Sequence, residues 1–318
     1  MTKTLTRNDT AAYLLNHDRY CLLTHRRPDG DTLGSAAALC LGLRQLGKAC
    51  VILENPEITP RFAWLHEGLT VEAPREGDTI VTVDVASPGM LPEAFKKYLG
   101  SIALRIDHHS SSTSFTDLEL VDGDSASCGE IIWDVLEIMG AAMEPKLAEA
   151  VYVALSTDTG CFRFSNTTEH TFATAAKCAA GGARVYALNQ ELFETNSLGR
   201  LRIQGWIVEH LKLLSGGKMA IVSIPRAVEQ HLQLTEDDMD NISNFPRTVA
   251  GVCMAATLRE EGDGRVKLSV RAIPGFDATV VASRFGGGGH KGAAGASFDC
   301  SLEEAAAAVE EAMLGLNG

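Results

Sequence analysis

Acidic and imidazole side chains gather in four short segments of the first half of this 318-residue chain. The segments and their polar residues are THRRPDGDTLGS with His25, Asp29 and Asp31, VTVDVAS with Asp84, RIDHHSS with Asp107, His108 and His109, and LSTDTGCF with Asp158. Each segment follows a short apolar or β-branched run. Because the carboxyl ends of parallel strands lie at one edge of a sheet, we expect these side chains to meet there.

This mixture of carboxylates and imidazoles predicts a divalent metal site. Carboxylate oxygens combined with imidazole nitrogens favour Mn²⁺ or another first-row ion, whereas closed structural zinc sites more often use thiolates. At least six candidate ligands are present, which is enough for two ions that share a carboxylate. Two-ion sites of this kind serve in-line displacement at phosphorus. The pattern therefore indicates a hydrolase of phosphate esters.

The formal net charge of −13 bears on the kind of substrate. Proteins that bind long nucleic acids neutralise many phosphates with lysine and arginine, so an acidic chain argues against a long duplex partner. A short anionic substrate needs only a local positive site, which bound divalent ions can supply. We therefore expect a small substrate.

Other features of the composition predict a cytoplasmic protein. No run of about 18 apolar residues is present to span a membrane, and the first residues lack the pattern of a secretory signal. The eight cysteines are scattered without a C-x-x-C pair, so we interpret them as reduced packing residues.

Strand and helix patterns alternate through the first half of the chain. This alternation is typical of an α/β fold with a doubly wound, mostly parallel sheet. The expected strands are 20–25, 49–54, 79–84 and 102–107. The expected helices are 34–47, 91–100, 126–140 and 145–160.

The alternation ends near residue 191, where 191–215 resembles one long connecting helix. The last third predicts a smaller α/β domain with a mixed sheet. Its expected strands are 219–225, 249–260, 264–273 and 296–301, and its expected helices are 231–242, 278–285 and 302–314. We therefore predict a catalytic domain over 1–190, a helical connector over 191–215 and a substrate-binding domain over 216–318.

Five motifs, taken together and in order, resemble those of DHH-family phosphoesterases that carry a C-terminal DHHA1 domain. They are HRRPDGDTLGS, VDVAS, DHHSS, TDTGCFRFSNTT and GGGGHKGAAG. The resemblance covers nearly the whole chain. Within the family, the chain is most similar to the nanoRNase and pAp phosphatase branch. The resemblance implies hydrolysis of di- to pentanucleotides to mononucleotides and dephosphorylation of adenosine 3',5'-bisphosphate (pAp). It also implies a homodimer.

The same resemblance implies two ions, most simply Mn²⁺, joined by a bridging carboxylate. The ligands would be His25, Asp29 and Asp84 for one ion, and Asp31, Asp84, His108 and Asp158 for the other. Residues two apart in an extended segment share a side, which would let Asp29 and Asp31 point into one cleft.

Three residues are candidates for the catalytic step itself. Asp84 would bridge the ions. His109 would contact a phosphate oxygen or assist the leaving oxygen, and Asp107 would orient an imidazole from behind.

A glycine run near the C-terminus is the second informative motif. Consecutive glycines let backbone N–H groups approach an anion closely, and the resemblance assigns this segment to substrate capture. The candidate binding residues are Arg271, Gly287, Gly288, Gly289, His290 and, less directly, Arg284. Phe162 and Phe164 each have two interpretations, stacking on a base or filling the core.

Three alternatives remain open from the sequence. A hydrolase of cyclic dinucleotides, or of their linear product pApA, would share every catalytic residue. A family II type pyrophosphatase or an exopolyphosphatase uses a similar metal site, but its small domain carries lysine and arginine clamps in place of the glycine motif. A noncatalytic nucleotide sensor is the third alternative, and loss of metal-dependent turnover in Asp84→Ala would exclude it.

Overall fold

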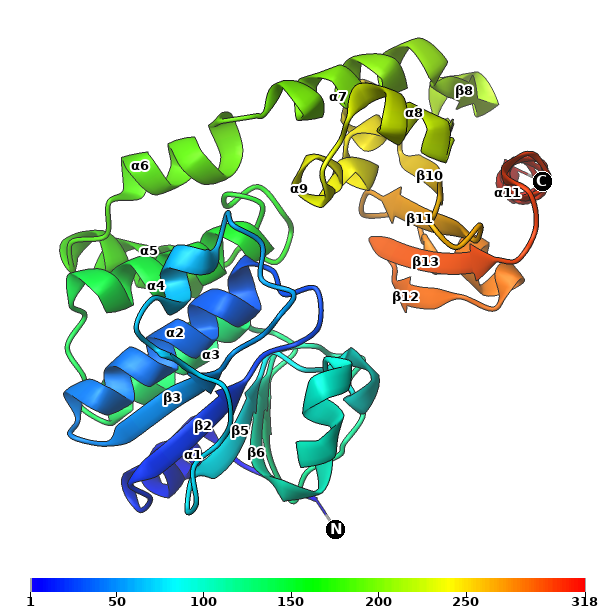
Figure 1. Cartoon of the computed structure of the whole chain (residues 1–318). Helices are drawn as coiled ribbons and strands as arrows, with labels where there is room; N and C mark the ends of the chain where they lie inside the picture. The colour runs from blue at the N-terminus through cyan, green and yellow to red at the C-terminus, as the bar shows by residue number, and fades with distance from the viewer. Residues whose placement is uncertain (1, 318) are drawn as a thin grey trace. The chain divides into compact units, whose positions relative to one another are not determined.

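A parallel sheet of seven strands forms the centre of the N-terminal part of the chain in this computed structural model, which describes residues 2–317 (Figure 1). Every neighbouring pair in the order β1-β7-β6-β5-β2-β3-β4 is parallel. The strands are β1 Lys3–Thr4, β2 Arg19–Leu23, β3 Ala49–Leu53, β4 Thr70–Val71, β5 Thr79–Val83, β6 Ile102–Asp107 and β7 Leu118–Val121. The predicted doubly wound parallel sheet is therefore confirmed.

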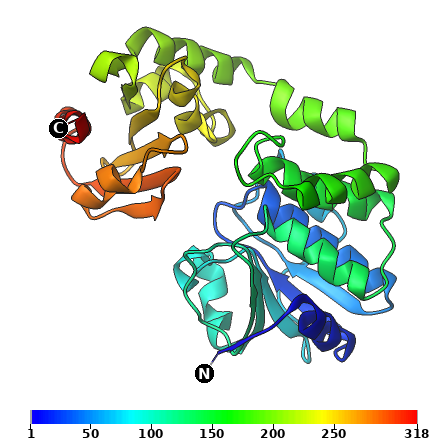
Figure 2. The same cartoon turned by 180° about the vertical axis from the view of Figure 1, so that it is seen from behind.

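Helical segments cover both faces of this sheet (Figure 1 and Figure 2). One face carries four α-helices and the other carries two short 3₁₀ helices, η2 Pro88–Met90 and η3 Glu93–Ser101. The α-helices are α1 Arg7–Leu15, α2 Gly30–Gln45, α3 Cys128–Ile138 and α4 Pro145–Asp158. The remaining helices of this part are η1 Ala63–His66, α5 Glu169–Ala180, α6 Val185–Asn189 and the π-helical η4 Gln190–Glu194.

The strand sequences explain the two covered faces. In β2, Tyr20 and Leu22 belong to the core under the α-helices, while Cys21 and Leu23 belong to the core under η3. All four side chains are fully buried. A strand that is buried on both faces has a continuous run of apolar residues, whereas a strand with one exposed face alternates apolar and polar residues. The central strands here have the continuous pattern.

Small residues bring α2 and α4 into close contact. A Cβ atom added at Gly34 would lie 2.5 Å from the carbonyl oxygen of Ala150 and 3.1 Å from the Cβ of Ala154. A Cβ atom at Gly30 would meet the side chain of Thr157 at 2.5 Å. The N-terminus of α2 is thereby held against the C-terminal end of α4.

A mixed sheet of six strands forms the second part of the chain, as predicted. Its order is β12-β13-β11-β10-β9-β8, with β9 and β10 parallel and the other pairs antiparallel. The strands are β8 Lys212–Leu214, β9 Met219–Ile224, β10 Met254–Glu260, β11 Val266–Ala272, β12 Gly288–His290 and β13 Ala293–Phe298. The helices are α7 Leu198–His210, η5 Ser215–Gly217, α8 Arg226–Leu232, α9 Glu236–Met239, η6 Ile242–Asn244, η7 Pro246–Thr248, α10 Thr279–Ala282, η8 Ser283–Phe285, α11 Leu302–Leu314 and η9 Gly315–Asn317.

Two predicted helices are wrong as continuous elements. The expected long helix over 191–215 is interrupted after η4, because Thr195 is extended and the Ser197 side chain caps the start of α7. The division between the two compact units, Met1–Thr195 and Asn196–Gly318, falls in this break. The expected helix over 231–242 is broken by Gln233, which has a left-handed conformation.

Some elements escaped sequence reasoning altogether. The short strands β1, β4 and β7 have two to four residues each, too few for a period to show. No strand was expected in the glycine run, yet its second half forms β12. The segment predicted as helix 91–100 is a 3₁₀ helix.

Two further observations concern the described residues as a whole. All eight cysteines are free thiols. No helix within residues 2–317 combines the length and the apolar character needed to cross a bilayer.

The contact between α2 and α4 gives a stability prediction. Gly34→Ala forces a methyl group against the backbone of α4, so we expect the free energy of unfolding to fall by about 1–3 kcal/mol. Urea unfolding followed by circular dichroism would measure it. Gly100→Ala is the matched control, because a Cβ atom at Gly100 meets nothing within 4 Å. Equal effects of the two substitutions would contradict the proposed contact.

Candidate active site

Three neighbouring strands deliver the polar residues to one edge of the parallel sheet. His25 follows β2, Asp84 directly follows β5, and Asp107 is the last residue of β6 with His108 immediately after it. The strands lie side by side in the order β6-β5-β2. Their carboxyl ends therefore bring these side chains together, as the sequence predicted.

The first group of possible metal ligands contains His25, Asp29 and Asp84. The Nε2 atom of His25 lies 3.6 Å from Oδ1 of Asp29 and 3.5 Å from Oδ2 of Asp84. The His25 and Asp84 side chains are buried, whereas Asp29 is 57% exposed. The group therefore has one open side, formed by Asp29.

The second group contains Asp31, His108 and Asp158, with Asp84 adjacent. The Nε2 atom of His108 lies 3.5 Å from Asp31 Oδ2, 3.6 Å from Asp84 Oδ1 and 3.6 Å from Asp158 Oδ2. The two oxygens of Asp84 thus face different groups. All six residues expected to bind metal lie in one of these two groups.

The start of α2 places Asp29 and Asp31, and it corrects one expectation. Asp29 is the N-cap of the helix and accepts hydrogen bonds from the N–H groups of Asp31 and Thr32. Asp31 lies inside the first turn and accepts from the N–H groups of Cys128 and Gly129 at the start of α3. The two aspartates do not share one side of an extended segment. They reach different groups because the helix begins between them.

Asp158 reaches the site from a helix, as the predicted helix over 145–160 implies. It is the last residue of α4. The close packing of α4 against α2 brings its carboxylate to the His108 group. The end of a helix and the ends of three strands therefore meet at the same site.

Asp84 occupies the centre of the cluster in an unusual conformation. Its φ of 60° lies in the left-handed region, which aspartate tolerates better than most residues. Its Oδ1 atom is buried and has no hydrogen-bond partner among the described residues. A buried carboxylate oxygen without a donor is costly, and a cation would compensate it.

The spacing of the ligand atoms fits a shared ion. Separations of 3.5–3.6 Å are too long for good hydrogen bonds. Atoms that each lie about 2.0–2.2 Å from one ion are roughly 3.0–3.5 Å apart. The residues present therefore fit divalent ions, with His25 and His108 each contributing one nitrogen.

Burial and mutual repulsion act on the carboxylates of the second group. The pKa of Asp31 is raised well above its usual value, first by burial and then by the charge of Asp84. The pKa of Asp158 is also raised well above its usual value, by burial and by the charges of Asp29 and Asp84. Without a cation these groups resist ionisation, so protons compete with metal for them.

The first group behaves oppositely, because it pairs a histidine with acids. Burial disfavours the charged form of His25, but Asp29 and Asp84 outweigh it and raise the pKa of His25 well above its usual value. Desolvation likewise opposes ionisation of Asp29, while His25 and the helix N–H groups lower the pKa of Asp29 to about 2.

Asp107 and His109 form a hydrogen-bonded pair beside the cluster. The Nδ1 atom of His109 lies 2.8 Å from Oδ1 of Asp107 and 3.5 Å from Oδ1 of Asp84. Burial opposes protonation of His109, but the bond to Asp107 and the charge of Asp84 raise the pKa of His109 to about 9. Asp107 therefore fixes the orientation of the His109 ring, which is 27% exposed, and favours its protonated form.

Sequence reasoning missed Arg105, the largest fully buried side chain in the molecule's described part. Its Nη2 atom lies 2.9 Å from Oε2 of Glu119, and its Nη1 atom lies 3.5 Å from Oδ2 of Asp107. Nη1 also donates to the carbonyl oxygens of Ala86 and Thr113. In the sequence, the one sign of this buried cation is an arginine inside the otherwise apolar strand segment IALRID.

Arg105 thereby connects the chain that follows Asp84 to the loop that follows the histidine pair. Glu119, its main anionic partner, also accepts hydrogen bonds from Ser114 and from the N–H group of Phe115. The charge of Arg105 helps to lower the pKa of Asp107, though less than His109 does, and against the effect of burial. Arg105 contacts neither group of possible metal ligands. It acts as a positioning residue for Asp107 and for the segments that follow Asp84 and His109.

A second candidate region lies on one face of the mixed sheet. Arg271 of β11 pairs with Ala293 of β13, which pairs with His290 of β12. Beside this row is a cavity of roughly 430 Å³. The residues that line it are Lys267, Leu268, Ser269, Arg271, Gly288, Ala293, Ala294, Gly295, Ala296 and Ser297.

The glycines of this region permit the approach of β12 to β13. A Cβ atom at Gly287 would lie 2.1 Å from the carbonyl oxygen of Gly295, and one at Gly289 would lie 2.5 Å from that of Ala293. Of the six predicted binding residues, Arg271 and Gly288 line the cavity. Arg284 does not line it, and its guanidinium instead donates to the carbonyl oxygen of Ala312 at the end of α11.

The structure separates the two interpretations of the phenylalanines. Phe162 packs against the core and stacks on Phe172 with ring centroids 5.6 Å apart. Phe164 is 39% exposed, and its ring covers Gly160, where a Cβ atom would lie 2.3 Å from it. Phe162 therefore has the core role, and Phe164 presents an aromatic surface six residues after Asp158.

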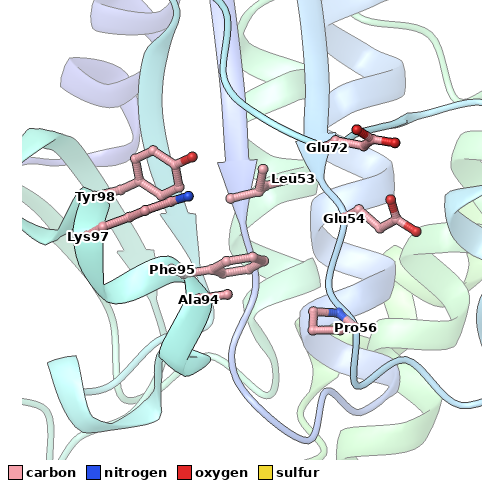
Figure 3. A pocket seen from close by; sticks show the side chains of 8 residues that line it. All are labelled: Leu53, Glu54, Pro56, Glu72, Ala94, Phe95, Lys97 and Tyr98. Carbon is pink, nitrogen blue, oxygen red and sulfur yellow. The ribbon is translucent and has the colours of Figure 1, made fainter.

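A further cavity of about 250 Å³ lies beside β3, β4 and η3 (Figure 3). Leu53 and Phe95 form its apolar centre, with Glu54 and Glu72 on one side and Lys97 and Tyr98 on the other. None of the predicted site residues lines it. The chemistry indicated by the sequence is therefore located elsewhere.

Each of the two parts of the chain matches a known protein family. Residues 19–155 match the model of the DHH family, N-terminal domain, and residues 216–314 match that of the DHHA1 domain. The chain is 30% identical to the bifunctional oligoribonuclease and PAP phosphatase NrnA of Thermus thermophilus, over 92% of this chain and 88% of that protein. It is 27% identical to the protein of the same name from Bacillus subtilis, over 89% and 90%.

A solved structure shares the fold. An exopolyphosphatase-related protein from Bacteroides fragilis superposes with a TM-score of 0.87 at 22% sequence identity. The superposition covers 96% of this chain and 95% of that one. At this level of identity the likeness supports the fold only.

Metal binding should change how stability depends on pH. The pKa values of Asp31 and Asp158 in the folded protein lie above the value of about 3.9 expected in the unfolded chain. At pH values between the two, the folded protein therefore binds more protons than the unfolded chain. Stability of the metal-free protein should therefore fall as pH rises through that interval. A cation binds the ionised carboxylates, so the rise in Tm caused by Mn²⁺ over EDTA should grow from about pH 5 to about pH 8.

Thermal unfolding in both solutions across this range would measure the difference. Asp158→Asn should reduce both the Mn²⁺ effect and its pH dependence. A gain in Tm that is the same at every pH would contradict the competition between protons and metal.

Removal of Arg105 should be strongly destabilising. Arg105→Met leaves Glu119 buried without its counter-ion, and we expect a loss of about 3–5 kcal/mol in urea unfolding. Adding Glu119→Gln should recover part of that loss, because the two side chains are coupled. Arg7→Met removes two partly exposed ion pairs, to Asp122 and Asp134, and should cost less than Arg105→Met, about 1 kcal/mol for each pair. Strict additivity of the two buried substitutions would refute the coupling.

Proposed function

The chain belongs to the DHH family of phosphoesterases and carries a DHHA1 domain, and from this premise we propose that it hydrolyses short oligonucleotides to mononucleotides and dephosphorylates pAp. One observation carries the proposal beyond the family. Asp84 lies between two groups of possible ligands with a buried, unpartnered oxygen. That is the arrangement needed for two ions that act on one phosphoryl group.

The proposed metal ligands follow the two groups. They are His25, Asp29 and Asp84 for one ion and Asp31, Asp84, His108 and Asp158 for the other. When bound, the ions supply Lewis-acid polarisation of the phosphoryl group and lower the pKa of a water molecule. Asp84 lies next to both sets of ligands. Asp31 accepts hydrogen bonds from the N–H groups at the start of α3, which fixes its carboxylate. Manganese as the ion, a homodimeric state and a cytoplasmic location stay predictions.

The remaining catalytic roles use side chains beside the ligands. His109, held by Asp107, donates a proton or a hydrogen bond to a phosphate or leaving-group oxygen. Support comes from the 2.8 Å contact between Nδ1 of His109 and Oδ1 of Asp107, which holds the ring beside Asp84 and favours the protonated imidazole. Asp107 orients this ring and does not contact the substrate.

The glycine-rich face of the second unit is the proposed binding surface for a nucleotide phosphate. Arg271, the backbone of Gly287–Gly289 and His290 are its residues. Support comes from the cavity along β11 and β13, whose volume suits a small ligand. Phe164 of the first unit is the better placed of the two phenylalanines for stacking on a base.

A substrate panel tests the proposal. Purified protein with Mn²⁺ should cleave pApA and release phosphate from pAp, while a 24-mer RNA and pyrophosphate remain nearly intact. Preferred turnover of cyclic di-AMP would move the assignment to the cyclic dinucleotide alternative. Absence of turnover on every substrate would leave the sensor alternative.

The matched variant for this panel is Asp84→Asn, which keeps the size of the side chain but removes the bridging charge. We expect at least about a 100-fold loss of kcat on pApA. Far-UV circular dichroism controls for folding. Full activity of this variant would contradict the proposed role of Asp84.

A further inference from the structure

Asn55 is a buried amide at the edge of the parallel sheet that carries the candidate active site. It lies just after β3, which runs parallel to its neighbour β2. The segments that follow these two strands lie side by side, so Asn55 meets the turn that carries His25. Asn55 is only 3% exposed. A buried amide must find its hydrogen-bond partners within the protein.

The partners of Asn55 belong to two different loops. Its Nδ2 atom donates to Oγ1 of Thr24 at 2.9 Å and to the carbonyl oxygen of His25 at 2.8 Å. Its Oδ1 atom accepts from the N–H group of Glu57 at 3.0 Å. Both N–H donors and the oxygen of the amide are thus used. Two of the three bonds hold the His25 turn, which comprises residues 24–27.

Glu57 holds the same turn two residues further along. Its Oε2 atom accepts from the N–H group of Arg27 at 2.9 Å. Arg27 has a φ of 49°, in the left-handed region that a residue with a side chain adopts only at a cost in conformational energy. The bond to Glu57 stabilises this conformation. Through it the chain passes from His25 to Asp29, the N-cap of α2.

The His25 turn also determines which nitrogen of the imidazole faces the cluster. The Nδ1 atom of His25 lies 2.8 Å from the carbonyl oxygen of Arg26. A carbonyl oxygen only accepts, so Nδ1 of the neutral ring carries the proton and Nε2 presents its lone pair. The Nε2 atom is the one that faces Asp29 and Asp84. The orientation that a metal ligand needs therefore depends on the backbone of this turn.

The second group of possible metal ligands is held by other elements. Asp31 accepts hydrogen bonds from the N–H groups of Cys128 and Gly129 at the start of α3. Asp158 is the last residue of α4. A change at Asn55 should thus affect the first group and spare the second.

We propose that Asn55 and Glu57 are positioning residues for one of the two metal ions, because they hold the His25 turn in the conformation that directs His25 and Asp29 towards Asp84. The inference rests on the proposed function, since it concerns one half of the proposed two-ion site. Neither side chain is itself a ligand. Residues that orient ligands in this way commonly change metal affinity by about 10- to 100-fold when they are replaced.

Isothermal titration calorimetry of the full-length, metal-free protein with Mn²⁺ tests the inference without a substrate. Asn55→Ala should weaken the binding of one Mn²⁺ by about 10- to 100-fold and that of the other by less than about threefold. Its activity on pApA should be low at a limiting Mn²⁺ concentration and largely restored at a high one. A general loss of structure would lower activity at every Mn²⁺ concentration.

Tyr20→Phe is the matched control for stability. Tyr20 is a fully buried residue of β2, and its hydroxyl donates to the carbonyl oxygens of Leu14 and His17. The substitution removes buried hydrogen bonds near the start of the strand whose other end leads to His25. It should lower Tm and leave both Mn²⁺ affinities unchanged.

Glu57 provides a second pair of variants, which decides the question if Asn55→Ala does not fold. Glu57 is exposed, so its replacement leaves the core intact. Glu57→Ala should weaken the same Mn²⁺ by about 3- to 10-fold, the value of one hydrogen bond. Glu57→Gln retains an oxygen for the N–H group of Arg27 and should recover most of that affinity. Equal losses in the two variants would assign the effect to charge and contradict positioning by Glu57.

A double variant tests whether Asn55 acts through His25. In a His25→Ala background, Asn55→Ala should change the remaining Mn²⁺ affinity by less than about twofold, because the residue that it positions is already absent. A further loss as large as that in the wild-type background would overturn the inference.

The remaining outcomes separate this inference from the proposed function. Unchanged Mn²⁺ affinity in Asn55→Ala, or equal losses for both ions, would overturn the inference. Wild-type protein that binds no Mn²⁺ would overturn it as well. Wild-type protein that binds two Mn²⁺ ions but cleaves no substrate of the panel would refute the proposed function, and the selective loss in Asn55→Ala would still support the positioning role.

Discussion

Repulsion among buried carboxylates is the constraint on which the first unit is built. Asp31, Asp84 and Asp158 lie around His108, with Asp31 and Asp84 buried and Asp158 partly exposed. Burial and the neighbouring charges raise the pKa values of Asp31 and Asp158. Such a cluster is stable only if protons or cations compensate its charge. The chemistry and the stability of this unit therefore depend on the same atoms.

Packing holds the cluster together against that repulsion. Glycines at the start of α2 let α4 approach, which brings Asp158 to the site. Asp31 accepts hydrogen bonds from the N-terminus of α3, where the helix dipole favours a negative charge. Arg105 secures the other side by joining the chain beyond Asp84 to the loop beyond His109. Residues outside the candidate ligand set, such as the glycines of α2 and Arg105, therefore supply much of the packing and hydrogen bonding that offsets the repulsion among the carboxylates.

The second unit presents the opposite electrostatic situation on a smaller scale. Among the described residues, Arg271 donates only to neutral acceptors, Asn244 and the carbonyl oxygen of Val270, although the chain as a whole is strongly acidic. A region of excess positive charge within an acidic protein attracts small anions and does not favour long polyanions. This distribution agrees with a substrate of a few nucleotides, bound by its phosphates.

The sequence by itself determined the strands that end in acids and histidines, the parallel sheet, and the family, because short ordered motifs and apolar runs are local signals. It could not show that Asp29 and Asp31 face different groups, or that Phe162 packs against the core while Phe164 is exposed. Those facts depend on how α2, α4 and the sheet pack. The role of Arg105 likewise emerges only from tertiary contacts, since a single arginine in a sequence does not reveal what charge lies beside it.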